Sequence, residues 1–246
     1  MKILGIIPAR YESSRFPGKV LADIKGKSMV QRVYEQASKC KNLDKVVIAT
    51  DNNQVIQHVT SFGGEAVLTD ASHASGTDRC FEALNLQSET YDYVVNIQGD
   101  EPFINPQQIT ELTNLLDGSI ELATLIKKIT TTDELFNLGE VKTVFNKNME
   151  ALYFSRHPIP YFRKAAELDW LQHQVYYKHI GIYGYRTDIL ERIANLPVSD
   201  LEEAESLEQL RWLENGLKIK LAMTDFESIC IDTREDLEKV LATLKQ

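Results

Sequence analysis

The chain has 246 residues, of which 43% are hydrophobic, and its formal net charge is −9 at pH 7. This length and apolar content are enough to bury a full core, either as one large domain or as a domain with an insertion. The negative charge argues against general nucleic-acid binding, so an anionic substrate would need local basic pockets. No apolar run reaches about 18 residues, and the sequence therefore predicts no transmembrane span.

The N-terminus and the cysteines favour a reducing cytoplasm of the bacterial type. The first residues, MKILGIIPARYE, include charged side chains before any small-residue cleavage site, which argues against a signal peptide. The three cysteines, Cys40, Cys80 and Cys230, are odd in number and widely spaced. They suit a reducing compartment, and their spacing predicts no metal-ligand cluster.

Strand-like and helix-like segments alternate through the first 120 residues. The predicted strands are Ile3–Pro8, Lys45–Thr50, Glu65–Leu68 and Tyr93–Gln98. The predicted helices between them are Met29–Cys40, Asn53–Phe62 and Thr77–Leu86. This alternation predicts right-handed βαβ units and an α/β fold, in which a mainly parallel twisted sheet carries helices on both faces.

After about residue 120 the pattern becomes mixed. The further predicted strands are Leu122–Lys127, Val141–Asn146, Ala151–Arg156, His179–Tyr185 and Lys218–Met223. The further predicted helices are Leu201–Asn215 and Thr233–Leu244. We therefore expect one domain over residues 1–246, in which the second half completes the sheet of a nucleotide-binding first half and holds a second substrate.

The loop after the first strand is the strongest chemical signal. It carries Arg10, Arg15 and Lys19, with a glycine just before the lysine. Guanidinium groups fork onto phosphate oxygens, and a glycine lets the backbone approach them closely. The loop is not a Walker A loop, because Val20 follows the lysine, and it lacks the three spaced glycines of a dinucleotide fingerprint. It predicts a nucleoside triphosphate held mainly by side-chain cations.

Two aspartates that follow short apolar runs are candidate magnesium ligands. Asp100 follows VVNIQG, and Asp232 follows Ile229–Ile231. Mg²⁺ takes one or two protein carboxylates and completes its shell with water and phosphate oxygens. Taken singly, each is equally compatible with a turn or with the start of a helix, which Thr233 and Asp236 indicate. Together with the cationic loop, they predict the metal and phosphate parts of a phosphoryl-transfer site.

The segment SHASGTDR, residues 72–79, precedes a predicted helix. Ser75, Gly76 and Thr77 are small and polar, and Arg79 lies in the first helical turn. An ordinary helix cap on Ser75 or Thr77 would explain the pattern. Alternatively, the backbone groups and Arg79 read the edge of a pyrimidine base.

Eight motifs along the chain carry a resemblance to one family. They are IPARYESSRFPGK, ATD at 49–51, HASGTDR, NIQGDEP, ALYFSR, KHIGIYGYR, ESLEQLR and CIDTRED. In this order they resemble the 3-deoxy-manno-octulosonate (Kdo) cytidylyltransferases, the CMP-Kdo synthetases of lipopolysaccharide biosynthesis. The resemblance extends from Ile3 to Asp236. The first loop is shared widely among sugar nucleotidyltransferases, whereas KHIGIYGYR with LEQLR is far more specific.

The resemblance implies a fold, a reaction and an assembly. The fold would be the Rossmann-like one of nucleotide-diphospho-sugar transferases, with residues 1–120 mainly for CTP and 121–246 mainly for the sugar and dimerisation. The reaction would transfer CMP from CTP to Kdo and release pyrophosphate, with Mg²⁺ as the cofactor. The enzyme would be a cytoplasmic homodimer that binds no nucleic acid and inserts into no membrane.

The resemblance also implies the site residues, position by position. The nucleotide would be bound by Pro8, Ala9, Arg10, Arg15, Lys19, Ser75, Gly76, Thr77 and Arg79. The sugar would be bound by Gln98, Arg156, His179, Tyr183, Glu208 and Gln209. Asp100 and Asp232 would hold Mg²⁺ and, with Arg10 and Lys19, carry the catalysis. A sugar with a carboxylate and many hydroxyl groups suits a pocket of a cation, amides, a carboxylate and a phenol.

Some of these residues have plainer interpretations. His179 on an apolar strand would usually be a hydrogen-bonded core histidine, and Tyr183 and Tyr185 could pack or contact a partner. Adjacent positions on a helix do not share a face, so the sequence leaves open whether Glu208 and Gln209 both reach the sugar.

Two departures from the family pattern and two rival functions stay open. Ala74 stands where members of the family often have Gln, which leaves an 8-amino analogue of Kdo possible as the substrate. Phe16 stands where Leu is commoner, which is a packing exchange.

A related enzyme would transfer CMP to another acid sugar or UMP to a sugar phosphate. The motifs KHIGIYGYR and LEQLR argue against this function. A non-catalytic nucleotide sensor would keep the fold, but the joint presence of two carboxylates and a cationic loop disfavours it.

Overall fold

The computed structural model describes residues 1–13 and 15–244, so residue 14 of the predicted phosphate loop and residues 245–246 lie outside the described residues. The strands are β1 (Ile3–Pro8), β2 (Asp23–Ile24), β3 (Lys27–Ser28), β4 (Lys45–Thr50), β5 (Ala66–Leu68), β6 (Tyr93–Asn96), β7 (Leu122–Lys128), β8 (Lys142–Phe145), β9 (Ala151–Ser155), β10 (Tyr177–Arg186) and β11 (Ile219–Met223). The helices are α1 (Met29–Ala37), α2 (Asn53–Ser61), α3 (Gly76–Asn85), α4 (Pro106–Thr113), α5 (Thr132–Phe136), α6 (Trp170–His173), α7 (Thr187–Ala194), α8 (Asp200–Glu205), α9 (Gln209–Glu214) and α10 (Arg234–Thr243).

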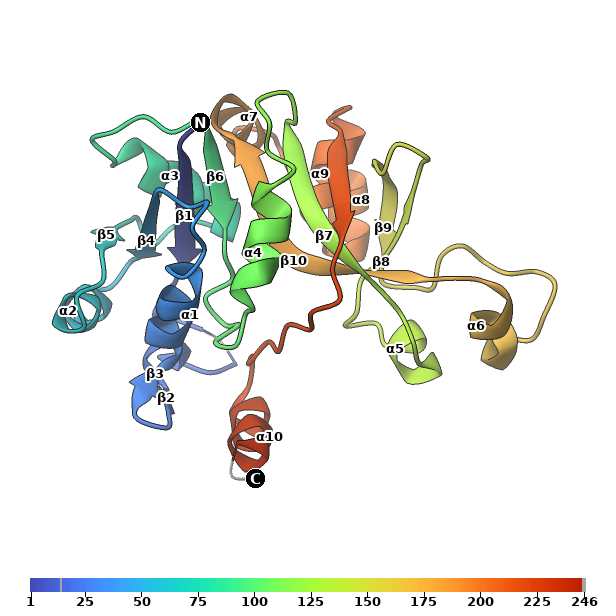
Figure 1. Ribbon diagram of the computed structural model, residues 1–246, viewed down its shortest axis with the longest axis horizontal. Coiled ribbons are helices and arrows are strands. Elements are labelled where there is room, and N and C mark those ends of the chain that lie inside the picture. The colour runs from blue at the N-terminus through green and yellow to red at the C-terminus, as the bar shows by residue number, and fades with distance from the viewer. Residues whose placement is uncertain (14, 245–246) are drawn as a thin grey trace.

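A nine-stranded sheet forms the centre of the molecule, in the order β11-β7-β10-β6-β1-β4-β5, with β8 pairing to β10 and β9 to β8 (Figure 1). Strands β6, β1, β4 and β5 run parallel, as do β11 and β7. Strand β10 lies antiparallel between β6 and β7. The predicted α/β fold with a mostly parallel, mixed sheet is confirmed.

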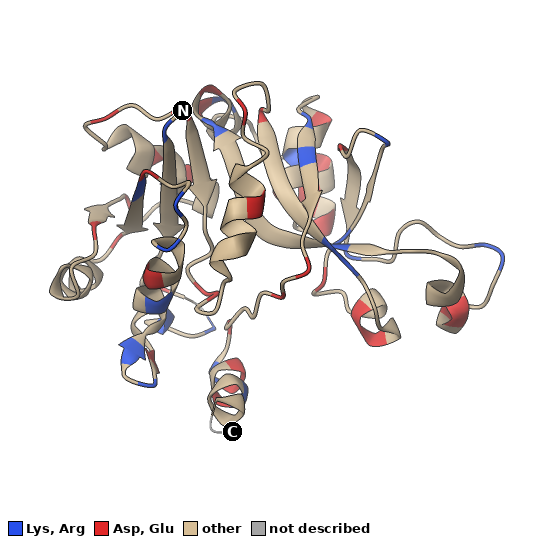
Figure 2. Ribbon diagram, viewed as in Figure 1, with Lys and Arg blue, Asp and Glu red and all other residues tan. Residues whose placement is uncertain are grey.

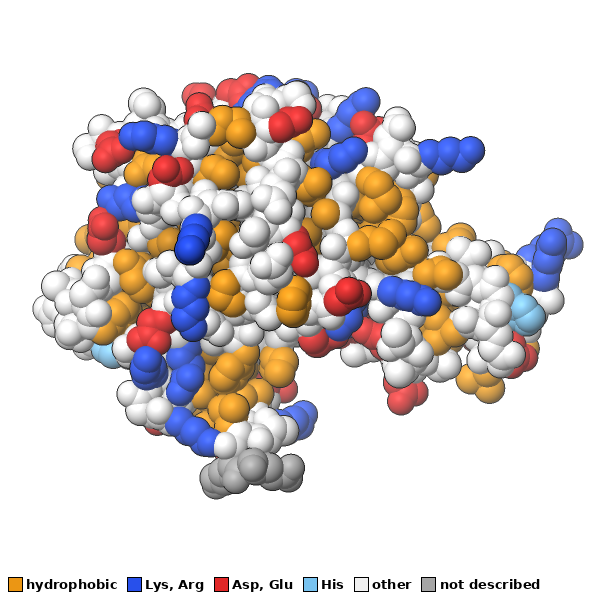
Figure 3. Space-filling model, viewed as in Figure 1, with side chains coloured by type: hydrophobic (Ala, Val, Ile, Leu, Met, Phe, Trp, Pro, Cys, Tyr) orange, Lys and Arg blue, Asp and Glu red, His pale blue; other side chains and the backbone are white. Residues whose placement is uncertain are grey.

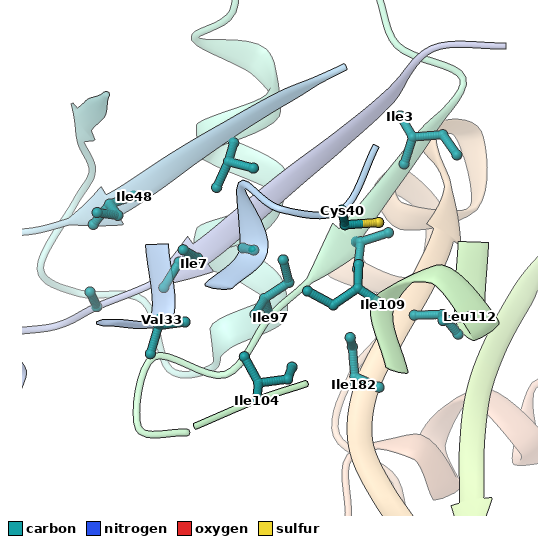
Figure 4. Packing of buried hydrophobic residues seen from close by; sticks show 14 of the residues in the cluster. Ile3, Ile7, Val33, Cys40, Ile48, Ile97, Ile104, Ile109, Leu112 and Ile182 are labelled. Carbon is teal, nitrogen blue, oxygen red and sulfur yellow. The ribbon is translucent and has the colours of Figure 1, made fainter. Parts of the chain in front are cut away.

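Strand β1 shows why the apolar run forms the middle of the sheet. Successive side chains of a strand point to opposite faces. Ile3 and Ile7 accordingly pack into one core, and Leu4 and Ile6 into the other. Figure 4 shows the first core from nearby, with strand isoleucines packed against side chains of α1 and α4. A strand buried on both faces has no polar alternation, as the sequence of β1 indicates.

Helices cover both faces of the sheet, as expected. The first core contains residues of α1, α2 and α4. The second contains residues of α3, α7 and α9, including Trp212, which is 1% exposed. Helix α10 instead packs on the β2–β3 hairpin through a small cluster that contains Ile24 and Val240. The chain between the sheet and α10 therefore crosses the edge of the sheet where the site described below lies (Figure 1).

The predicted helix Leu201–Asn215 is wrong as a single element, because it forms two helices, α8 and α9. Ser206 ends α8 in the left-handed region, with φ 52°. A left-handed residue stops helix propagation and redirects the chain. The break turns the start of α9 toward the sheet, with consequences for Glu208 and Gln209.

An arm projects from the far edge of the sheet. It comprises β8, β9, α5 and α6, and Figure 1 shows it beyond β10. Its own small cluster includes Ile129, Leu135, Trp170 and Tyr176. Within residues 1–13 and 15–244, helices fall short of the length and apolarity that crossing a bilayer requires.

Candidate active site

The site lies at the carboxyl edge of the parallel strands. Strands β1 and β6 pair in register, with Ile6 opposite Asn96, so the loops that follow them emerge side by side. Gly99 allows this approach, because a Cβ there would lie 2.6 Å from the Pro8 carbonyl oxygen. In this way Asp100, after β6, is brought next to the cationic loop after β1. Figure 2 shows basic and acidic segments together between the sheet and α10.

Lys19 joins the two aspartates predicted to bind metal. Its ammonium donates to Asp100 Oδ2 at 2.8 Å and to Asp232 Oδ1 at 2.9 Å, and Arg15 pairs with Asp232 Oδ2 at 3.0 Å. Burial works against the charged ammonium, but the two aspartates outweigh it and the pKa of Lys19 is raised. The backbone N–H of Ile231 donates to the Asp100 carbonyl at 2.9 Å, which fixes the segment bearing Asp232.

A cavity of about 270 Å³ opens beside this cluster and contains most of the predicted nucleotide residues. Its lining includes Pro8, Ala9, Arg10, Arg15, Lys19, Ser75, Gly76 and Arg79, together with Gln98, Asp100 and Asp232. The lining also holds His73 and Ala74, so the departure from the family pattern faces this cavity. Phe16 is buried under the guanidinium of Arg234, which lies 5.1 Å from the ring centroid.

The start of α3 forms one wall of this cavity. Ser75 caps the helix by accepting from the Asp78 N–H, and Asp78 completes a capping box. The helix-cap interpretation is therefore confirmed, and the same residue lines the cavity. Arg79 is 3% exposed, and its guanidinium bonds Thr69 Oγ1 at 2.6 Å and Asp51 Oδ2 at 3.2 Å. The charge of Arg79 is therefore neutralised within the protein by the Asp51 carboxylate.

A second, smaller cavity of about 140 Å³ adjoins the first. The two cavities share Gly76 and Gln98. The remaining lining is polar or aromatic and comprises Thr77, Asn96, Tyr183, Tyr185, Glu208, Gln209 and Trp212. Thr77 therefore faces this cavity and donates to Glu208 Oε2 at 2.9 Å.

Three residues that line the second cavity carry buried side-chain polar atoms. Asn96 Oδ1, Tyr183 Oη and Trp212 Nε1 have no hydrogen-bond partner among the described residues. Leaving a buried polar group unpaired is unfavourable by about 1–3 kcal/mol, and such groups often mark a ligand. Burial also raises the pKa of Tyr183 and of Glu208, so the phenol keeps its proton as a donor.

The sequence leaves open whether Glu208 and Gln209 both reach the sugar, and the structure brings both to the second cavity. Glu208 is the N-cap of α9 and Gln209 its first residue. The helical-face rule applies inside a helix, whereas the chain bends at this point after Ser206.

His179 and Arg156 line neither of these two cavities. His179 instead lines a third cavity, of about 650 Å³, together with Arg15 and Asp232, and Arg156 is half-buried. His179 Nε2 lies 2.9 Å from Thr124 Oγ1, and its ring packs on Phe154 and Tyr183. Burial lowers its pKa to about 3, so the imidazole is neutral. The guanidinium of Arg156 donates to the carbonyls of Glu205 and Ser206, at 2.6 and 3.1 Å. Arg156 thereby satisfies carbonyls that the end of α8 leaves free.

Sequence reasoning missed several residues of the site. The sequence pattern places Asn96 and Trp212 in the core, because a local pattern does not reveal that a cavity lies beside these two residues. Cys230, whose sequence spacing from the other cysteines predicts no metal cluster, lies beside the two candidate metal ligands Asp100 and Asp232. Its sulfur and one oxygen each of Asp100 and Asp232 lie within 4.8 Å of one another.

The fold and the site define a nucleotidyltransferase. The protein-family model of the cytidylyltransferases matches residues 4–219. The fold alone is shared with a 4-diphosphocytidyl-2C-methyl-D-erythritol synthase from Anaerococcus prevotii, at a TM-score of 0.65 and 13% identity over 100% of this chain and 99% of that one.

Closer relatives narrow the class. A 3-deoxy-manno-octulosonate cytidylyltransferase of Parabacteroides distasonis is 54% identical over 99% of this chain and 98% of its own. The same enzyme of Cytophaga hutchinsonii is 51% identical over 99% and 98%. A structure of CMP:2-keto-3-deoxy-manno-octonic acid synthetase complexed with CTP matches with a TM-score of 0.92 and 42% identity over 100% and 99%. The chain belongs to the 3-deoxy-manno-octulosonate cytidylyltransferase family.

Proposed function

We propose that this chain transfers CMP from CTP to 3-deoxy-D-manno-octulosonate, giving CMP-Kdo and pyrophosphate for lipopolysaccharide biosynthesis. The observation that carries the proposal is the meeting of two unlike cavities at Gly76 and Gln98. One is lined by four Lys and Arg side chains and two carboxylates, and the other by hydroxyl, amide and carboxylate groups. A triphosphate suits the first and a polyhydroxylated sugar suits the second.

In this proposal the chain acts mainly by positioning and by neutralising charge. The anomeric hydroxyl of the sugar attacks the α-phosphorus in line, and pyrophosphate leaves. Arg10, Arg15 and Lys19 bind the triphosphate and stabilise the departing pyrophosphate, because guanidinium and ammonium groups counter its growing negative charge. The shared residues Gly76 and Gln98 lie where the two substrates would meet.

The donor set fits Mg²⁺, since two carboxylates converge on one position and already share a cation, the Lys19 ammonium. Mg²⁺ selects oxygen ligands and leaves part of its shell for phosphate oxygens and water. Asp100 and Asp232 would hold it. When bound, it would lower the pKa of the attacking hydroxyl and screen the approach of that hydroxyl to an anion.

The sugar would occupy the second cavity. The atoms of Asn96, Tyr183 and Trp212 that find no partner among residues 1–13 and 15–244 offer one acceptor, one phenol and one N–H donor to sugar hydroxyls. Glu208 and Gln209 add a carboxylate and an amide. We keep Arg156 and His179 as proposed sugar residues, with the condition that Arg156 would have to exchange carbonyl partners for the sugar carboxylate.

We also propose the organisation and setting implied by the resemblance. The chain would be one domain over residues 1–246, with 1–120 mainly for CTP and 121–246 mainly for sugar and dimerisation, working in the cytoplasm. Apolar side chains exposed on or next to the arm, such as Leu138, Tyr161 and Leu168, support a homodimer. Hydrophobic surface on the arm side of the molecule is visible in Figure 3. Light scattering on the purified protein tests the dimer, and a monomeric mass would refute it.

Pyrophosphate release from CTP tests the reaction. Purified protein is given Mg²⁺ and CTP with Kdo, with 8-amino-Kdo, or with another acid sugar. Kdo-dependent release that EDTA abolishes is the expected result. Pyrophosphate release with 8-amino-Kdo alone would indicate that the surroundings of Ala74 select the amino sugar. CTP binding without pyrophosphate release in the presence of any of these sugars would favour a nucleotide sensor.

A further inference from the structure

Asp51 joins two walls of the first cavity from behind. It follows β4, which pairs with β1, and it precedes Asn52, whose side chain caps α2. Its Oδ1 accepts from the Tyr11 N–H at 3.0 Å, and its Oδ2 accepts from the Arg79 guanidinium at 3.2 Å. Of these residues only Arg79 belongs to the described lining of the cavity. One carboxylate therefore ties together two segments that come from distant parts of the chain.

The contact with Tyr11 holds the base of the cationic loop. The Tyr11 carbonyl accepts from the Gly18 N–H at 3.0 Å, so a backbone hydrogen bond closes the loop at this point. Gly18 has a φ of 70°, a left-handed conformation that favours glycine. Arg10 directly precedes Tyr11, and Lys19 directly follows Gly18. Both cations are thus next to the pair of residues that Asp51 Oδ1 anchors.

The contact with Arg79 holds the opposite wall. Arg79 lies near the start of α3, where Ser75 and Gly76 line the cavity, and its guanidinium also donates to Thr69 Oγ1 at 2.6 Å. The side chains of Arg79 and Asp51 are 3% and 9% exposed. Breaking a buried ion pair by removing one partner is strongly unfavourable. The pair therefore keeps the start of α3 fixed against the end of β4.

We propose that Asp51 is a positioning residue, which sets the spacing between the cationic loop and the start of α3. A nucleoside triphosphate in this cavity has to contact both walls at once, and a displacement of about 1 Å between bound groups can lower a rate about 100-fold. Asp51 acts through Tyr11 and Arg79 and touches neither substrate itself. The inference rests on the proposed function, because it assumes that CTP occupies the first cavity.

Asp51→Glu distinguishes spacing from charge. Glutamate keeps the negative charge opposite Arg79, but its extra methylene lengthens the side chain by about 1.5 Å. The dissociation constant of CTP should rise about tenfold and kcat should fall about tenfold, whereas the KM for Kdo at saturating CTP stays within about twofold. A carboxylate that only neutralises Arg79 would leave all three values unchanged. Calorimetry with CTP and Mg²⁺, without Kdo, gives the affinity, and initial rates of pyrophosphate release give the kinetic values.

Asp44 provides the matched control. It precedes β4, and its Oδ2 accepts from the Ile3 N–H at 2.7 Å, so it ties β4 to the opposite end of β1. Asp44→Glu makes the same chemical change away from the cavity and should alter the CTP affinity less than about twofold. Asp51→Asn is the complementary variant. An amide nitrogen cannot accept a hydrogen bond, so asparagine cannot serve Tyr11 and Arg79 together, and CTP binding should again weaken about tenfold.

A measurement on the unmodified protein keeps the proposal testable if both Asp51 variants unfold, which circular dichroism would reveal. Hydrogen exchange of the Tyr11 amide should be slowed about 100-fold relative to an unstructured peptide. Normal CTP affinity and kcat in Asp51→Glu, an equal loss in Asp44→Glu, or an unprotected Tyr11 amide would each overturn the positioning role. Absence of Kdo-dependent pyrophosphate release from the unmodified protein would instead contradict the proposed function.

Discussion

Lys19 Nζ donates a hydrogen bond to Asp100 Oδ2 at 2.8 Å, although the two residues are 81 positions apart in the chain. The contact links the loop after β1 to the loop after β6. It also shows that a cation is stable against this carboxylate in the free protein.

Asp100→Asn should lower turnover at least about 100-fold while the protein remains folded. The amide cannot offer two anionic oxygens to a divalent cation, and loss of one strong electrostatic contact in an active site is typically of this size. Pyrophosphate release at saturating CTP and Kdo measures the effect, and circular dichroism reports the fold. Asp225→Asn is the matched control and should retain full turnover, since Asp225 is exposed. Near-normal turnover of Asp100→Asn would remove Asp100 from the metal site.

Lys19→Met should have opposite effects on metal binding and on turnover. Without the ammonium, Asp100 and Asp232 lose a competing cation, so Mn²⁺ should bind several-fold more tightly in the absence of nucleotide. Turnover should fall about 100-fold, because the triphosphate loses a positive partner. Paramagnetic resonance of free Mn²⁺ gives the affinity. Weaker Mn²⁺ binding in Lys19→Met would mean that the lysine supports the site instead of competing with the metal.

Tyr183→Phe should raise the KM for Kdo about tenfold and leave thermal stability unchanged or slightly higher. The phenol is unpaired in the free protein, so its removal breaks no existing hydrogen bond among the described residues. Tyr93→Phe is the matched control. Tyr93 Oη donates to the Ile120 carbonyl at 2.7 Å and accepts from the Gly118 N–H at 3.0 Å.

The two tyrosine variants should therefore show opposite patterns. Tyr93→Phe should lose about 1 kcal/mol of stability with an unchanged KM for Kdo. Thermal denaturation and initial-rate kinetics distinguish them. A destabilised Tyr183→Phe with a normal KM would make Tyr183 a packing residue.

Arg79→Met should destabilise the fold by about 3–5 kcal/mol, because it leaves the Asp51 carboxylate without its charged partner and, among the described residues, only the Tyr11 N–H bonded to it. The side chains of the pair are only 3% and 9% exposed. Arg186→Met serves as the comparison, since Arg186 and Asp188 are 29% and 63% exposed, and an exposed pair contributes about 0–1 kcal/mol. Urea denaturation measures both. Equal losses in the two variants would contradict the structural role of Arg79.

His179 should make the protein less stable in acid. Burial lowers its pKa to about 3, whereas an unfolded histidine titrates near 6.5. Between those values the unfolded chain binds a proton that the folded protein does not, so the free energy of unfolding falls as the pH is lowered from about 6.5 to about 3. The contribution approaches about 1.4 kcal/mol per pH unit. The stability of His179→Asn, followed by urea denaturation, should fall less steeply over this window, and identical slopes would refute the assignment.

Local pattern was sufficient for many of the elements. The bounds of β1 and β4 match the predicted strands, because uninterrupted apolar, β-branched runs between loops leave little choice of conformation. The helices α4 and α7 were not predicted, since short amphipathic segments resemble loops in a sequence. The break at Ser206 was missed because a left-handed serine has no sequence signature of its own.

The sequence by itself determined the parallel α/β core, the cationic loop and the placement of Asp100 at a strand end. Each depends on neighbours a few residues away, and hydrophobic period and turn chemistry carry that information. Only the tertiary structure decided that Lys19 lies between Asp100 and Asp232, that Arg79 faces Asp51, and that Cys230 joins the aspartates. These contacts link distant segments through the packing of the sheet edge and of α10, and no local pattern encodes such distances.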